Sequence, residues 1–108
     1  MEPGIYLEVK DIPLGSLHGK RHAYLVYRKP DGTTEVIRGG PKLPNLTIEV
    51  ETGKSLEKSK DHLKEGEKPG TRPSRKLDIP SGKWDESWSK MRAKAEENGL
   101  IKPDQVLS

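Results

Sequence analysis

Apolar and polar residues alternate in two stretches of the chain, which is the pattern of a strand with one buried face. The stretches Ile5–Lys10 (IYLEVK) and Leu46–Glu51 (LTIEVE) each place three aliphatic side chains in phase. The stretch His22–Arg28 (HAYLVYR) differs because it carries apolar residues on both faces. A strand that needs cover on both sides lies inside a sheet, so we predict that this third stretch is a central strand.

A turn signal follows the central strand. Pro30 pre-sets φ for the first turn position, Asp31 suits the second, and Gly32 can adopt the left-handed conformation that closes a hairpin with a bulge. Thr34–Arg38 then returns as the antiparallel arm. We predict a β-hairpin here, whose second arm ends at the glycines and proline of Gly39–Pro41.

The helical pattern is clearest near the end of the sequence. Ser81 can cap the start of this helix, and Asn98–Gly99 supplies a stop signal. With no Phe in the chain, two tryptophans that bury roughly 150–250 Å² each would dominate the core. We therefore expect a helix over Trp84–Asn98 that covers one face of the sheet. Four apolar residues share one stripe of it: Trp84, Trp88, Met91 and Ala95.

A charged segment separates the strands from the helix. Residues 52–76 hold eight Lys or Arg and four Asp or Glu, with glycines and prolines among them. We predict a mobile, solvated loop over 52–75, in which Ser55–Lys64 has the composition of a short helix. Lys76–Pro80 is predicted to be a short edge strand.

Composition limits the chain to a single small domain. It has 108 residues, of which 30% are hydrophobic and 34% charged, with a formal net charge of +3. We predict an α+β fold: an antiparallel sheet of four or five short strands with one amphipathic C-terminal helix. The ordered core is expected at 5–51 and 76–101. No signal peptide or membrane-spanning run is visible, so we expect a soluble protein, cytoplasmic or exported without a classical signal peptide.

His22 is the candidate catalytic residue. A histidine at the head of a central strand can be held rigidly and still reach solvent, as a general base must. The same position also suits a histidine that is half packed against its neighbours. No cysteine is present and the histidine spacings match no metal pattern, so neither a metal site nor a cofactor is expected.

The sequence from residue 22 to residue 41, HAYLVYRKPDGTTEVIRGGP, resembles the His-bearing hairpin of circularly permuted papain-like hydrolases, the NlpC and retinol-acyltransferase types. The longer run through SKD at Ser59–Asp61 and the later WDESWSKM looks like C-terminal domains of large bacterial secreted and toxin-like proteins. This resemblance implies that His22 is the base, that Gly39 and Gly40 form a close-approach turn, and that Trp88 packs the helix.

The chain departs from that family pattern in its nucleophile. It has no cysteine, and the Asn-Ser-Asn segment expected after the tryptophan helix does not occur in the sequence. The second polar residue that the acyltransferase relatives place in the returning strand falls near Ile37 and Arg38, where this chain has no histidine. The resemblance therefore implies a bacterial protein without turnover of its own, which binds a protein partner. The candidate binding residues are Tyr24, Arg38, Gly39, Gly40 and Trp88.

Two alternatives stay open. In the first, the protein is a hydrolase or acyltransferase in which His22 activates a serine such as Ser16 or Ser108. In the second, it is a basic adaptor that binds an acidic surface or nucleic acid through residues 52–76. Interleaved acids and the lack of aromatic residues in that stretch disfavour nucleic acid.

Overall fold

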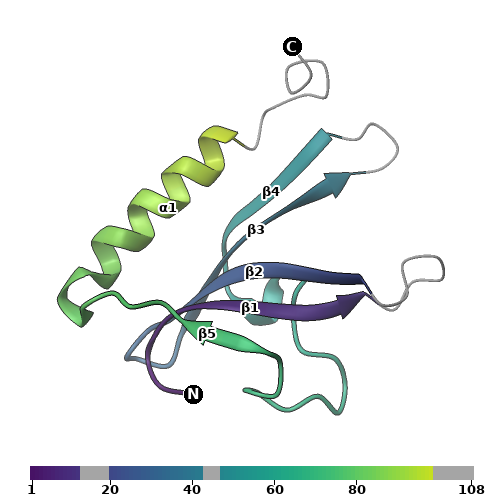
Figure 1. Ribbon diagram of the computed structural model, residues 1–108, viewed down its shortest axis with the longest axis horizontal. Coiled ribbons are helices and arrows are strands. Elements are labelled where there is room, and N and C mark those ends of the chain that lie inside the picture. The colour runs from purple at the N-terminus through teal and green to yellow at the C-terminus, as the bar shows by residue number, and fades with distance from the viewer. Residues whose placement is uncertain (13–19, 43–46, 99–108) are drawn as a thin grey trace.

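The computed structural model describes residues 1–12, 20–42 and 47–98. It contains one five-stranded antiparallel sheet and one α-helix, which confirms the predicted α+β class (Figure 1). The sheet order is β4-β3-β2-β1-β5, so β2 is central as predicted. The elements are β1 (Gly4–Ile12), β2 (Lys20–Arg28), β3 (Thr34–Lys42), β4 (Thr47–Lys54), η2 (Leu56–Lys58), β5 (Ser74–Lys76), η3 (Ser81–Lys83) and α1 (Trp84–Asn98).

The β2–β3 hairpin forms as its turn residues predict. The N–H of Lys29 donates to the carbonyl of Thr33 at 2.9 Å, and the N–H of Gly32 donates to the carbonyl of Lys29 at 3.0 Å. Gly32 has φ +89°, the left-handed conformation that glycine adopts without steric cost. The Asp31 carboxylate accepts the N–H of Thr33 and fixes the turn.

The glycine pair lies inside a strand, so the expected close-approach turn is wrong. β3 runs on to Lys42, and Gly39 and Gly40 pair with Val50 and Glu49 of β4. The partner strand supplies a continuous ladder, which overrides the preference of two adjacent glycines for a turn.

A β-bulge bends the β3–β4 ribbon. Val36 pairs with Lys54 whereas Arg38 pairs with Glu51, so β4 carries one extra residue between these pairs. Gly53 sits in that interval with φ +75°, a conformation that favours glycine. A bulge increases local twist and bend, and β3 and β4 accordingly turn away from β1 and β2 (Figure 1).

The β2–β3 ladder ends beside the bulge. Its last pair is Leu25 with Ile37. Beyond this pair, Lys20–Tyr24 of β2 and Arg38–Lys42 of β3 form no ladder with each other. We call this place the split: β2 from Lys20 to Tyr24 and β3 from Arg38 to Lys42, running on without pairing with each other.

Helix α1 covers one face of the sheet and has the predicted bounds. Trp88 is 3% exposed and packs in a cluster with Ile5, Tyr27 and Ile37. Trp84, Met91 and Ala95 pack against that cluster, which confirms the apolar stripe. Ser81 does not cap the helix through its side chain, since it begins the 3-10 turn η3 that leads into α1.

The charged segment covers the opposite face. Most of its residues are exposed, as expected of a solvated loop, but four of them are buried. Leu56 is buried in a cluster with side chains of β1, β2 and β3, and the same segment buries Ser59, Asp61 and Arg72. The suggested helix over Ser55–Lys64 is reduced to the 3-10 turn η2. A few buried residues hold this segment on the sheet. They could not be recognised from its composition, which is polar on average.

The edge strand comes earlier than predicted. β5 spans Ser74–Lys76 and pairs with Tyr6–Glu8 of β1, whereas Leu77 and Ile79 pack towards the helix. No helix among the described residues is both long enough and apolar enough to cross a membrane.

Candidate functional site: His22 and a buried carboxylate

A buried carboxylate holds three basic side chains together. Asp61 is 0% exposed, and its Oδ1 lies 2.6 Å from Lys10 Nζ. Its Oδ2 lies 3.0 Å from Arg38 Nε, and Oδ1 lies 3.6 Å from His22 Nε2. We call these four residues the Asp61 cluster.

The fold brings the cluster together from four parts of the chain. Lys10 and His22 face each other across the β1–β2 ladder. Arg38 is contributed by β3 immediately after Ile37, where the ladder to β2 ends. Asp61 comes from the segment that covers this face, where the Ser59 hydroxyl accepts the N–H of Asp61 at 3.0 Å.

The surroundings of His22 favour its neutral imidazole. Burial is the main cause that lowers its pKa below 6.5; the nearby Arg38 and Lys10 lower it as well, against the opposing effect of Asp61. Arg38 Nε lies 3.3 Å from Nε2 and donates to it when the ring proton is on Nδ1, whereas Asp61 Oδ1, at 3.6 Å, accepts from Nε2 when the proton is there. The cluster thus engages Nε2, and among the described residues no hydrogen bond reaches Nδ1.

A second buried network adjoins the cluster. The Tyr24 hydroxyl donates to Glu8 Oε2 at 2.7 Å, and Arg28 donates to Oε1 of the same carboxylate at 2.8 Å. The rings of His22 and Tyr24 stack at 6.3 Å. Burial and the hydrogen bond to Glu8 raise the pKa of Tyr24 well above its usual range, so its hydroxyl stays protonated. Tyr24 is buried and serves this network rather than a surface.

Arg72 fastens the covering segment to the sheet. Its guanidinium forms two parallel bonds to the Glu67 carboxylate, at 2.8 and 2.9 Å. It also donates to Tyr24 Oη at 2.8 Å and to the carbonyls of Asp61 and His62 at 2.6 and 2.9 Å. A guanidinium used in this way contributes little positive charge to the surface that the adaptor alternative requires.

The Glu67–Arg72 pair makes stability depend on acid pH. Hydrogen bonds from Arg72 lower the pKa of Glu67 from 4.5 to about 2. A carboxylate with a depressed folded-state pKa stabilises the fold above its unfolded pKa and loses that contribution as pH falls towards the folded value. We expect the unfolding free energy to fall between pH 4.5 and about 2. Glu67→Gln should flatten this part of the profile in urea unfolding, whereas Glu65→Gln should leave it unchanged. An unaltered slope in Glu67→Gln would contradict the assignment.

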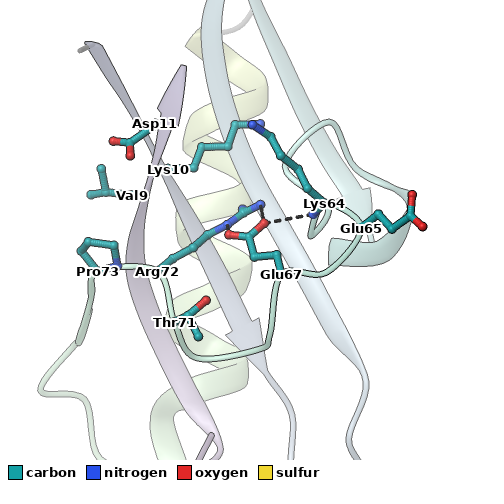
Figure 2. A pocket seen from close by; sticks show the side chains of 9 residues that line it. All are labelled: Val9, Lys10, Asp11, Lys64, Glu65, Glu67, Thr71, Arg72 and Pro73. Atoms are coloured by element: carbon teal, nitrogen blue, oxygen red, sulfur yellow. Dashed lines mark hydrogen bonds and ion pairs between the residues drawn. The ribbon is translucent and has the colours of Figure 1, made fainter. Parts of the chain in front are cut away.

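A pocket of about 390 Å³ adjoins the second network, between the end of β1 and the covering segment. Figure 2 shows the Arg72 and Glu67 side chains facing each other in it. Arg72 and Lys10 are already paired with carboxylates, so they do not offer the pocket an uncompensated charge. The lining residues are Val9, Lys10, Asp11, Lys64, Glu65, Glu67, Thr71, Arg72 and Pro73.

The structure unites some predicted site residues and separates others. His22 and Arg38 touch, with Gly39 and Gly40 following on β3. Trp88 lies under the helix on the other face, where its indole N–H donates to Glu35, so it serves the core.

Lys10 and Asp61 were missed as site residues. Lys10 occupies a polar position in an alternating strand pattern, as a solvated lysine would. The only indication for Asp61 in the sequence was the SKD motif. Ser16 and Ser108, the serines suggested as nucleophiles, lie outside the described residues. In the part of the chain that the structure describes, no group of three His, Asp or Glu side chains is arranged to hold a metal ion.

No family model, curated protein or solved structure matches this chain. The geometry around His22 therefore has to carry the functional inference.

Proposed function

We propose that this chain is a small bacterial protein that binds a protein partner and has no turnover of its own. Its scaffold would be similar to the His-bearing part of permuted papain-like hydrolases, with the partner completing the site beside His22. The observation that supports this most is the pairing of a neutral imidazole with the fully buried Asp61 carboxylate.

The Asp61 cluster has two of the properties that a general base needs. A base must be neutral before it takes a proton, and a third group must orient its ring. Burial favours the neutral form of His22, and Asp61 Oδ1, 3.6 Å from Nε2, orients the ring in the tautomer whose proton is on Nε2. In that tautomer Nδ1 is unprotonated and can take up a proton.

The nucleophile is the part that the described chain does not provide. A nucleophile must lie within about 3 Å of the base, and the sequence holds no cysteine. The buried Ser59 hydroxyl donates to the Leu56 carbonyl and accepts from the N–H of Asp61. No serine or threonine hydroxyl of the described residues forms a hydrogen bond with His22. A partner that carries the nucleophile would supply the third group.

The test is reconstitution with a captured partner. The tagged full chain is used to retain proteins from a bacterial lysate, and the complex is assayed on ester and amide substrates. Hydrolysis should require both components. His22→Ala should lower the rate of the complex by about 10²–10⁴-fold, the usual contribution of a general base, while binding is retained.

His62→Ala is the matched control, because His62 lies on the covering segment outside the cluster, and it should leave the rate unchanged. A complex whose rate survives His22→Ala would refute the proposal. Hydrolysis by the chain alone, lost in His22→Ala, would instead establish the serine hydrolase alternative. Failure to retain any polypeptide would also refute the proposal.

A further inference from the structure

The split exposes backbone groups that would continue a ladder. The N–H of Val9 donates to the carbonyl of Pro73 at 3.0 Å, and the carbonyl of Ile5 accepts from the N–H of Leu77 at 2.8 Å. The backbone N–H and C=O groups of odd-numbered β1 residues therefore face β5. In an antiparallel sheet this direction alternates, and even-numbered residues of β1 therefore bond to even-numbered residues of β2. The backbone N–H and C=O groups of odd-numbered β2 residues therefore face β3. Those of Ala23 lie at the split.

The same alternation explains a proline inside β3. Pro41 is paired with Ile48 of β4, and it is odd-numbered like Gly39 and Ile37. Its missing N–H therefore faces the split and removes no bond from the β3–β4 ladder. Proline is tolerated in a strand where its nitrogen faces no partner strand. This stretch of β3 therefore has the character of an edge on the side that faces β2. The β2 side keeps its donors and is the better edge for an added strand.

The two faces of the sheet differ beside the split. On one face lie the His22 imidazole and two cations, Arg38 and Lys10, which share the Asp61 carboxylate. Among the bonds of the described residues, Arg38 uses only Nε, and its two terminal nitrogens remain as donors.

The other face is small and apolar beside the split. Ala23 and Gly39 are exposed there. Leu7 is 39% exposed on the same face, but it belongs to β1, on the other side of β2 from the split. α1 does not cover this part of the face, because it runs alongside β3 and β4 (Figure 1). An extended segment at the split would thus meet the Arg38 guanidinium on one side and the exposed Ala23 and Gly39 on the other.

We propose that the split binds an extended segment of the partner, which adds as a strand to the β2 edge at Ala23 and alternates apolar with acidic residues. Successive side chains of a strand point to opposite faces. In this arrangement the apolar side chains lie beside Ala23 and Gly39, and the carboxylates lie beside Arg38. This inference rests on the proposed function, because it names how the partner docks beside the histidine.

The probe is an acetylated, amidated heptapeptide of alternating valine and glutamate. Its affinity for the full chain is measured by calorimetry, next to two control peptides: one with lysine in place of glutamate, and one with the same composition in blocks. The alternating acidic peptide should bind, and the controls should bind at least about tenfold more weakly, since a tenfold change is about 1.4 kcal/mol.

Ala23→Pro removes the N–H that faces the split and leaves the β1 ladder intact, so it should reduce peptide affinity at least about tenfold. Ala23→Val keeps the N–H and should bind like the wild type. Amide hydrogen exchange of the wild-type chain gives a reading that does not depend on the folding of a variant. The peptide should slow exchange at Ala23 and leave Tyr24, whose N–H faces β1, unchanged.

An alternating peptide that does not bind, or that binds without protecting Ala23, would overturn the inference. Equal binding of the block peptide would overturn it as well. The proposed function fails separately. If His22-dependent hydrolysis stands but the peptide does not displace the captured partner, strand addition is wrong and partner completion remains. If the peptide binds and protects Ala23 but no complex hydrolyses substrate, the split is a binding site and the proposed function is wrong.

Discussion

Asp61→Asn is expected to lower the free energy of unfolding by about 3–5 kcal/mol, the usual cost of breaking a buried ion pair by removing one partner. The amide has nearly the size of the carboxylate, so a cavity is not the cause. The loss arises because Lys10 and Arg38, whose side chains are 20% and 14% exposed, would be left close together with no anion between them. Urea unfolding at pH 7 measures it.

Asp78→Asn is the matched control, since Asp78 is exposed and its replacement should change the unfolding free energy by less than about 0.5 kcal/mol. A domain of this size has a total stability of about 5–15 kcal/mol, so Asp61→Asn would remove a large part of it. If both variants unfolded at the wild-type urea concentration, the three basic groups would be solvated well enough to need no carboxylate. The Asp61 cluster would then not be a rigid site.

Trp88→Ala is expected to lower the free energy of unfolding by about 3–5 kcal/mol, as is usual when a large aromatic side chain is removed from a core. Trp88 is buried against Ile5 and Ile37, and its ring lies 5.7 Å from that of Tyr27. Its indole N–H also donates to Glu35, whose carboxylate accepts from Arg92 as well. Thermal and urea unfolding measure the loss.

Trp84→Ala is the comparison, because Trp84 lies on the same stripe one turn earlier and is only partly buried. Its replacement should cost less, about 1–3 kcal/mol. Trp88→Phe keeps most of the buried surface and should fold even if Trp88→Ala does not. Equal losses for the two alanine variants would mean that the helix is not anchored chiefly at Trp88.

The buried polar layer has a structural consequence. Buried ionic networks often contribute less to stability than to the choice of one arrangement over others. Here Arg72 and Asp61 join the covering segment to β1, β2 and β3 through directional bonds. These bonds fix the position of the covering segment on the sheet, because the segment has too few apolar residues to be held there by hydrophobic burial alone. They also fix the surroundings of His22.

Elements with a local physical cause were determined by the sequence itself. The β2–β3 turn follows from Pro30, Asp31 and Gly32, because each residue prefers the backbone angles that its turn position requires. α1 follows from the spacing of its apolar stripe, and the central position of β2 from apolar residues on both of its faces. These signals depend on neighbours within a few residues, so no knowledge of the fold was needed.

The site was decided only by the tertiary structure. His22 and Asp61 are far apart in sequence, and nothing near Asp61 in the chain predicts that it is buried against an imidazole. The split depends equally on distant parts: Gly53 bends β4, β3 bends with it, and the ladder to β2 ends at Leu25. Burial, ion pairing and strand pairing between distant segments are settled by which surfaces meet when the chain folds. The sequence pattern identifies residues that could make such contacts, but it does not show which of them meet.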